Sequence, residues 1–444
     1  MSTPRTTTQI FFASSLYGAA TLAAALDSGC FAPAGRRLLL VANNAATPET
    51  TPPLDRMPGF ERLRDRFDGV LSWNEAVAPF HPGGWTPRPD DVPLWERYLR
   101  LLWGLGRDRV ELVVESLHVV PALAVAQLFP DAPIDVYADG LMSYGPTRDR
   151  LDPLVGERVR RLLHLDLVPG LRPLLLAEFG AEPVLVPAEA FTKVVDELAA
   201  DEPAAGDGES GRALLLGQYL AALGILSPDE EEALHVRMVR GAVAVGHRRL
   251  VFKPHPVAPA SWARTLEREA AGLGAELTVL ERPLLAEVVF LRMRPALVAG
   301  CFSTALFTAG AFYGLPVARL GTGPLLDRLA PYQNSNRVPV TLADALLPDL
   351  DAGESGAPRA ADADLTGLVN AVGFAMQPRV RADLRPAAER YLAGVGRTGQ
   401  ELTRYFKRRR LTVLGLPGGL PVPRGALARR VVRRARRLRR AAPR

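Results

Sequence analysis

The stretch Arg249-Leu-Val-Phe-Lys-Pro-His-Pro256 joins a short apolar run to a stiff loop with two ionisable side chains. The apolar run is typical of a buried strand, and open α/β folds place their ligands at loops that follow such strands. Each proline restricts the residue before it to extended geometry, so Lys253 and His255 leave the loop in defined directions. The stretch predicts a parallel-sheet strand followed by a functional loop. A plain surface loop that carries a histidine is the alternative.

A second strand end carries hydroxyl groups. Pro295-Ala-Leu-Val-Ala299 reads as a buried strand, Gly300-Cys-Phe-Ser-Thr304 follows it, and an apolar helical pattern continues to Tyr313. The free amides and positive dipole end of a helix N-terminus favour phosphate, and Ser303 and Thr304 add hydroxyl donors. The alternative is that these two residues are ordinary helix caps.

A third strand end lies in the first half of the chain. Ile134-Asp-Val-Tyr137 predicts a strand, and Ala138-Asp139-Gly140 follows it. An aspartate before a glycine is common turn chemistry. The same aspartate is also a candidate general base if its surroundings tune its pKa.

The remaining pattern predicts an α/β protein of two doubly wound, Rossmann-like halves. Apolar runs at 8–13, 36–41 and 109–114 alternate with helical stretches, which indicates a parallel sheet, and a second strand series starts at 212–217. We expect an N-terminal Rossmann-like domain over 1–198, a linker over 199–211, a second Rossmann-like domain over 212–400 and a basic tail over 401–444. The linker prediction follows from an acidic run that has no large apolar residue.

Taken in order, the three motifs resemble those of the bacterial sialyltransferases and polysialyltransferases. Those families carry an acidic motif that ends in glycine, a His-Pro motif and a Ser-Ser or Ser-Thr motif. The matching positions are Asp139-Gly140, His255-Pro256 and Ser303-Thr304. One departure is Ala138, which stands at the first acidic position. If the family's base occupies that position, Asp139 must act in its place or the acceptor is handled differently.

The resemblance implies a GT-B fold, with two Rossmann-like domains facing a central cleft, and an inverting transfer of sialic acid or a related nonulosonic acid from a cytidine monophosphate (CMP) donor. The N-terminal domain, 1–198, would hold the acceptor and the base, and the C-terminal domain, 212–400, would bind the nucleotide. Asp139 would take the proton of the acceptor hydroxyl and His255 would assist the leaving phosphate. The donor side comprises Lys253, Pro254, Pro256, Gly300, Ser303 and Thr304, and the acceptor side comprises Ser14, Ser15 and Gly140.

No metal or other cofactor is expected, because the donor has a single phosphate to neutralise. The sequence has neither a zinc-type ligand spacing nor a glycine-lysine phosphate loop. Two other functions stay open. A CDP-glycerol-type surface-polymer transferase would use a diphosphate donor, and a noncatalytic relative would bind nucleotide or glycan without turnover.

The basic charge of the chain is concentrated at its carboxyl end. Arg424–Arg444 carries ten arginines and no acid, so its removal changes the formal net charge from +6 to about −4. The rest of the chain is therefore not predicted to bind nucleic acid specifically. Apolar residues interleave with the arginines, which suits contact with an anionic membrane surface and a lipid-linked acceptor. The alternative is a solvated tail that sticks to nucleic acid nonspecifically.

The amino terminus does not predict a signal peptide, because Ser14-Ser15 interrupts its apolar run and Asp27 stands where cleavage would occur. No uninterrupted apolar run of transmembrane length is present. Cys30 and Cys301 are too few for a disulfide framework and suit a reducing compartment. We therefore expect a cytoplasmic enzyme, with a peripheral position on the inner face of the membrane as a further expectation from the tail.

Overall fold

The first half of the protein is built on a seven-stranded sheet. The computed structural model describes residues 6–138, 140–203, 211–218, 220–255, 259–395 and 400–420. The strand order is β3-β2-β1-β4-β5-β6-β7 and every pair is parallel. The strands are β1 (Thr7–Ala13), β2 (Arg36–Val41), β3 (Gly69–Ser72), β4 (Arg109–Glu115), β5 (Ile134–Ala138), β6 (Val159–Leu165) and β7 (Glu182–Val186).

The second half contains a five-stranded parallel sheet of order β10-β9-β8-β11-β12. Its strands are β8 (Ala213–Leu216), β9 (Arg249–Lys253), β10 (Glu276–Val279), β11 (Leu297–Gly300) and β12 (Val317–Arg319). Each sheet reverses its strand order at a central strand, which is the doubly wound arrangement predicted from the sequence. The predicted strands at the three motif positions are therefore confirmed.

Helices cover both sheets, as their parallel connections require. Those of the first half are α1 (Leu16–Asp27), α2 (Glu61–Arg64), α3 (Trp73–Val77), α4 (Val92–Leu102), α5 (Ala122–Leu128), α6 (Pro153–Gly156) and α7 (Ala188–Leu198). Those of the second half are α8 (Pro228–Ala244), α9 (Ala260–Gly272), α10 (Ala286–Met293), α11 (Thr304–Tyr313), α12 (Thr322–Arg328) and α13 (Arg337–Leu346). The carboxyl-terminal group is α14 (Ala363–Met376), α15 (Arg385–Val395), α16 (Gln400–Tyr405) and α17 (Arg408–Leu414).

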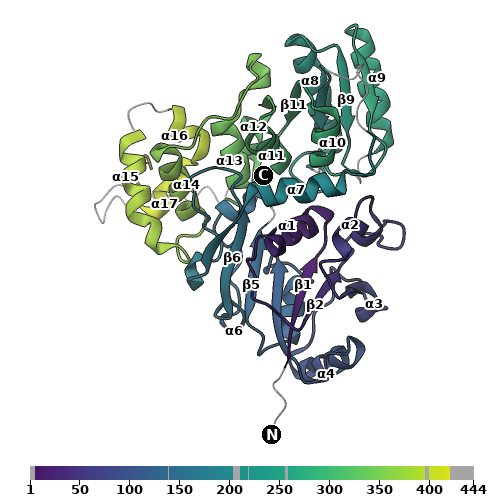
Figure 1. Ribbon diagram of the computed structural model, residues 1–444. Coiled ribbons are helices and arrows are strands. Elements are labelled where there is room, and N and C mark those ends of the chain that lie inside the picture. Colours follow the sequence, from purple (N-terminus) through teal and green to yellow (C-terminus); the bar gives the residue numbers. More distant parts are fainter. Residues whose placement is uncertain are drawn as a thin grey trace, which may run out of the picture.

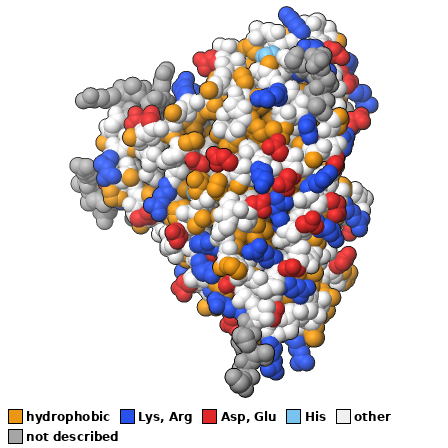
Figure 2. Space-filling model, viewed as in Figure 1, with side chains coloured by type: hydrophobic (Ala, Val, Ile, Leu, Met, Phe, Trp, Pro, Cys, Tyr) orange, Lys and Arg blue, Asp and Glu red, His pale blue; other side chains and the backbone are white. Residues whose placement is uncertain are grey.

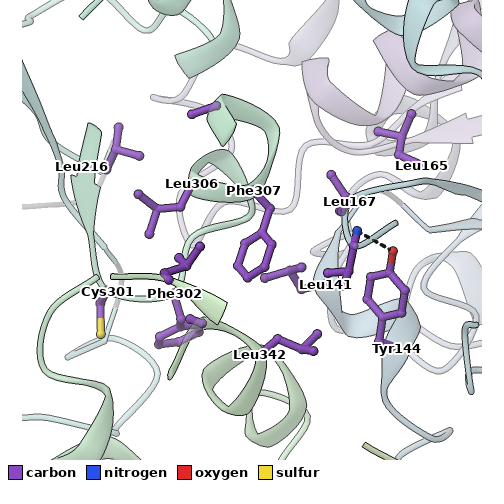
Figure 3. Close-up of a cluster of buried hydrophobic side chains, with 14 of the residues drawn as sticks. Leu141, Tyr144, Leu165, Leu167, Leu216, Cys301, Phe302, Leu306, Phe307 and Leu342 are labelled. Atoms are coloured by element: carbon purple, nitrogen blue, oxygen red, sulfur yellow. Dashed lines mark hydrogen bonds between the residues drawn. The ribbon is translucent and has the colours of Figure 1, made fainter. Parts of the chain in front are cut away.

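The two halves share an apolar interface. One continuous cluster of buried residues includes strands of both sheets, and α7 lies between the halves in Figure 1. In Figure 3, Leu141 of the short helix η3 (Leu141–Tyr144) lies beside Phe307 of α11. The Val168 amide donates to the Tyr144 hydroxyl at 3.1 Å, which anchors η3 to the first half. The fold therefore holds the ends of the two sheets against each other.

The carboxyl-terminal helices return to the first half. Arg381 donates to the Leu174 carbonyl at 3.0 Å, and a Cβ on Gly373 of α14 would lie 2.8 Å from a Leu174 methyl group. These helices form the group at the side of the molecule in Figure 1. Among the described residues, no helix combines the length and apolarity needed to cross a bilayer.

The charge of the body is mixed. On the face shown in Figure 2, acidic and basic side chains are interspersed. The arginine-rich segment from Arg424 onward lies outside the described residues. The expected membrane contact of this segment therefore stays a prediction.

Candidate active site

A cavity of about 410 Å³ lies between the two halves. The first half contributes residues that follow β4 and β5, and the second half contributes the starts of α11 and α13. Both sheets thus direct the carboxyl ends of their strands toward one space, where parallel α/β folds bind ligands. Its walls include Tyr17, Ser116, His118, Tyr137, Ala138, Gly140, Arg148, Gln218, Glu287, Phe302, Ser303, Thr304 and Asn336.

Two of the three sequence motifs meet across this cavity. Gly140 follows β5 and Thr304 begins α11, and a Cβ built on Gly140 would lie only 2.8 Å from the Thr304 hydroxyl oxygen. Ordinary contact requires at least 3.4 Å, so a side chain at position 140 would collide with the opposite half. Gly140 therefore permits a close approach of the acidic-glycine motif to the Ser-Thr motif.

The turn between β11 and α11 is held by a glutamine. The Cys301 and Phe302 amides both donate to Gln218 Oε1 at 2.9 Å. Ser303 caps α11, because its Oγ accepts from the Ala305 amide at 3.3 Å. At the expected phosphate site, the hydroxyl groups of Ser303 and Thr304 are the donors that could bind a phosphate. The two amides of the turn already donate to the Gln218 side chain.

Cys301 is fully buried, and burial raises the pKa of its thiol. This environment disfavours the thiolate form, which is the nucleophilic one. Gly300 ends β11 and pairs with Arg319 of β12. Gly300 and Cys301 therefore have structural roles in the turn between β11 and α11.

Lys253 ends β9 and lies close enough to Glu287 of α10 for their charges to interact. Burial lowers the pKa of Lys253, and the negative charge of Glu287 opposes that shift. Burial raises the pKa of Glu287, whose carboxyl group accepts from Thr308 Oγ1 at 2.7 Å. Lys253 and Glu287 thus stabilise each other's charged form, and Glu287 itself lines the cavity.

His255 is half-buried two residues beyond β9. Burial, assisted by the positive charge of Lys253, lowers its pKa to about 4. The imidazole is therefore neutral at pH 7 in the free protein. Neither His255 nor Lys253 is among the described residues that line the cavity, and neither is Pro254. Pro256 lies outside the described residues.

On the first half, Ser14 and Ser15 lie behind the cavity wall and are not among its lining residues. Ser14 Oγ donates to the Glu115 carboxylate, and Ser15 caps α1 by accepting from the Gly18 amide at 3.0 Å. Tyr137, which does line the cavity, donates through its hydroxyl to Glu115 Oε2 at 3.0 Å. The two serines thus support the wall through Glu115 and through α1.

The acidic motif is described in part. Ala138 ends β5 and lines the cavity together with Gly140, whereas Asp139 lies outside the described residues. His118, from the loop after β4, lies on the same wall, and burial lowers its pKa. Ser116 in that loop has a φ of 30°, an unfavourable conformation for a residue with a side chain.

Sequence reasoning missed Glu115, His118 and Glu287. Glu115 directly follows the apolar run at 109–114, and Glu287 is a lone acid inside the apolar stretch 284–291. A single acid in an apolar setting was the available signal, because a buried carboxylate needs a specific partner. His118 has no comparable sequence signal.

Two doubly wound parallel domains with a cavity between their strand ends define the GT-B architecture. A family model described as Alpha-2,8-polysialyltransferase (POLYST) matches residues 9–322. The chain belongs to the alpha-2,8-polysialyltransferase family, as the order of its three motifs predicted.

Several solved structures are similar to this chain at low identity. The GT-B domain of a sialyltransferase from Photobacterium damselae is 13% identical, with 75% of this chain and 95% of that chain covered and a TM-score of 0.39. MurG from Acinetobacter baumannii is 12% identical, with 87% and 93% covered and a TM-score of 0.39. A UDP-GlcNAc 2-epimerase from Methanocaldococcus jannaschii is 13% identical, with 70% and 83% covered and a TM-score of 0.42. No curated protein matches the chain.

Proposed function

We propose that this glycosyltransferase moves sialic acid, or a related nonulosonic acid, from a CMP donor to a cell-surface glycan with inversion at the anomeric carbon. The observation that carries the proposal is the close approach of Gly140 to Thr304 inside the interdomain cavity of a polysialyltransferase family member. It supports an arrangement in which the acceptor side and the donor side face one another.

On the donor side, the Ser303 and Thr304 hydroxyls donate hydrogen bonds to the phosphate oxygens of CMP. The His255 imidazole donates to the same phosphate as the bond to the sugar breaks and negative charge collects there. Lys253, Pro254, Pro256 and Gly300 set the geometry of the two loops. No metal takes part in this proposal, because these donors and the helix N-terminus face a single phosphate.

On the acceptor side, Asp139 removes the proton of the acceptor hydroxyl. The acceptor oxygen then bonds to the anomeric carbon from the face opposite the departing CMP, and the electron pair of the broken bond leaves with the phosphate. Gly140 keeps the approach narrow, and Ser14 and Ser15 hold the wall through Glu115 and α1. Ala138 is the observation that favours a noncatalytic relative as the second candidate.

The proposed setting is the cytoplasmic side of the membrane, where CMP sugars are available. We propose that Arg424–Arg444 contacts anionic lipid headgroups and so brings the enzyme to a lipid-linked acceptor. Deletion of that segment should weaken binding to vesicles that contain phosphatidylglycerol without changing turnover of a soluble acceptor. Unchanged vesicle binding would remove the lipid contact from the proposal.

The primary test compares binding of CMP, CDP, UDP and GDP by thermal shift and calorimetry, because a ligand that binds the folded state raises its apparent stability. Selective stabilisation by CMP that is weakened in Thr304→Ala supports the proposal, and turnover of a CMP sugar then completes it. Preference for CDP indicates a glycerophosphotransferase. CMP binding without turnover of any CMP sugar indicates the noncatalytic relative.

A further inference from the structure

The last helix of the described chain, α17, has an outer surface that combines positive charge with exposed apolar side chains. Arg408 and Arg409 are exposed. Val413 is 78% exposed, which is the largest fraction for any large apolar side chain in the described residues. Arg409 and Val413 are one helical turn apart and therefore lie on the same face. This helix lies beside α14 in the group at the side of the molecule in Figure 1.

The opposite side of α17 anchors the helix to the body of the protein. Leu411 is fully buried, and Leu416 in the following turn is also buried. The Arg410 guanidinium donates to the Ala375 carbonyl at 2.8 Å, at the carboxyl end of α14, where a cation is favourable. The outer face of α17 therefore has a fixed place on the surface.

The chain folds back after α17 and brings a second apolar side chain to the same surface. Gly415 ends the helix with a φ of 66°, and the Leu420 amide then donates to Thr412 Oγ1 at 2.8 Å. Thr412 precedes Val413, so Leu420, which is 48% exposed, emerges next to Val413. We define the α17 face as the exposed set Arg408, Arg409, Val413 and Leu420.

The two arginines of the α17 face have unused hydrogen-bond donors. Among the described residues, neither guanidinium group has a hydrogen-bond or ion-pair partner. The sequence from Leu402 to Arg444 contains no aspartate or glutamate. The charge of the face is therefore not neutralised by its own segment.

The acids of the neighbouring elements are compensated or distant. Glu389 of α15 accepts from Arg385 at 2.8 Å. Asp327 is adjacent to Lys407, whose ammonium group donates to the Asp327 carbonyl at 2.8 Å. Asp364 stands near the start of α14, about 16 Å along the helix axis from the end that contacts α17. The α17 face thus keeps two uncompensated positive charges.

We infer that the α17 face docks onto an anionic lipid bilayer. Arginines at such a surface bind lipid phosphates, and apolar side chains enter the boundary between headgroups and acyl chains. Arg424, the first of ten arginines in Arg424–Arg444, is four residues after Leu420, so at most about 14 Å of chain separates it from the face. The inference rests on the membrane setting of the proposed function but not on its donor or its reaction.

The exposed apolar side chains favour a bilayer over a nucleic acid. A nucleic acid would use Arg408 and Arg409 through its phosphates but would leave Val413 and Leu420 in water. A bilayer would bury both apolar side chains and neutralise both arginines at once.

The first experiment measures cosedimentation of the full chain with vesicles of phosphatidylglycerol and phosphatidylcholine. One variant is Val413→Gln with Leu420→Gln, and the other is Arg408→Gln with Arg409→Gln. All four positions are exposed, so folding should be preserved. We expect each variant to bind the vesicles about tenfold or more weakly, because apolar burial is lost in one and phosphate contacts in the other. Only the effect of the arginine substitutions should shrink at high salt.

Two control variants match these changes elsewhere on the surface. Leu154→Gln alters an apolar side chain of α6 that is 77% exposed. Arg97→Gln with Arg264→Gln removes two exposed arginines, from α4 and α9. Both controls should bind vesicles as the wild type does.

The second experiment separates the α17 face from Arg424–Arg444, which could sediment the protein without bringing residue 413 to the acyl chains. In Val413→Trp, vesicles brominated on their acyl chains should quench more fluorescence than they quench from the five tryptophans of the wild type. Leu154→Trp is the matched control and should show no added quenching. Added quenching in Val413→Trp alone supports the inference.

Equal vesicle binding by the wild type and both α17-face variants overturns the inference, as does the absence of added quenching in Val413→Trp. Binding to single-stranded DNA without binding to vesicles assigns the arginines to nucleic acid and also overturns it. CMP affinity, measured in the same proteins, should be unchanged by the α17-face substitutions. Failure of the wild type to bind CMP would contradict the proposed function and leave the result for the α17 face intact.

Discussion

Replacement of Gly140 by alanine should lower the activity of the enzyme, because the new methyl group would collide with Thr304 on the opposite wall of the cavity. The new Cβ would lie 2.8 Å from Thr304 Oγ1 where ordinary contact begins at 3.4 Å, so the atoms must separate by about 0.6 Å. Overpacking of this kind costs about 1–3 kcal/mol. Thr304 can avoid the contact by turning its hydroxyl away, which removes the donor proposed for the phosphate. We expect kcat/KM to fall roughly 5- to 150-fold.

The second substitution Thr304→Ala makes this prediction specific. Thr304→Ala removes the hydroxyl that the new methyl group at position 140 would meet. The Cβ of residue 304, which remains in the variant, lies 3.9 Å from that methyl group and so makes only an ordinary contact. In that background Gly140→Ala should change kcat/KM by no more than about twofold, so the effects of the two substitutions are strongly non-additive. Gly323→Ala, where a Cβ meets nothing within 4 Å, serves as the matched control.

The assay measures kcat/KM with a CMP sugar and a glycan acceptor for the four proteins of the cycle, with CMP affinity by calorimetry. If Gly140→Ala lowers activity equally in both backgrounds, the clash with Thr304 is not the cause. If it leaves activity unchanged beside wild-type Thr304, the close approach of the two motifs has no role in turnover.

Three further outcomes are expected. Burial lowers the pKa of His235 to about 4, below its ordinary 6.5, so between these two pH values the unfolded chain binds more protons than the folded chain. The thermal midpoint of unfolding should therefore fall as the pH drops from 6.5 to 4. His235→Phe should reduce that fall, as measured by calorimetry. The phosphate of bound CMP should raise the pKa of His255, so the affinity of the protein for CMP should increase when the pH is lowered from 7.5 to 5.5. The increase should be larger in the wild type than in His255→Gln. The variant serves as the control, because the titration of CMP itself is the same for both proteins. Gln218→Ala leaves two amides without their acceptor and should cost about 1–3 kcal/mol of stability in urea unfolding. Gln218→Glu should keep stability but weaken CMP binding by about tenfold, and equal CMP affinity in both Gln218 variants would contradict a phosphate at this turn.

The strand ends of the site were predictable because their patterns are local. An apolar run followed by Lys-Pro-His-Pro, by Gly-Cys-Phe-Ser-Thr or by Ala-Asp-Gly indicates a strand and its loop, and the structure places β9, β11 and β5 there. The capping box at Ser227, with proline at the next position, is a local pattern of the same kind, and α8 begins directly after it. Parallel pairing then brings such strand ends to one edge of a sheet.

The contacts between distant residues were not predictable. Thr304 meets Gly140 because two separate sheets face each other, and the distance along the chain gives no measure of that approach. The bond of Gln218 to the Cys301 and Phe302 amides depends on the adjacency of β8 and β11, which the sequence order hides. The strands β3, β6, β7, β10 and β12 also have weaker patterns, because polar residues, proline or short length interrupt their apolar runs.

Lys253 is one of three lysines in the chain, with Lys193 and Lys407, and its surroundings explain why a lysine suits this position. Glu287 and Lys253 favour each other's charged form, and the charge on Lys253 in turn helps to keep His255 neutral in the free protein. A phosphate bound beside the loop would offset Lys253 and reverse that last effect, because a nearby anion favours the imidazolium. Donor binding would then be coupled to proton uptake by His255. The histidine would become a proton donor only when the leaving phosphate is present, which is when the proposed reaction requires one.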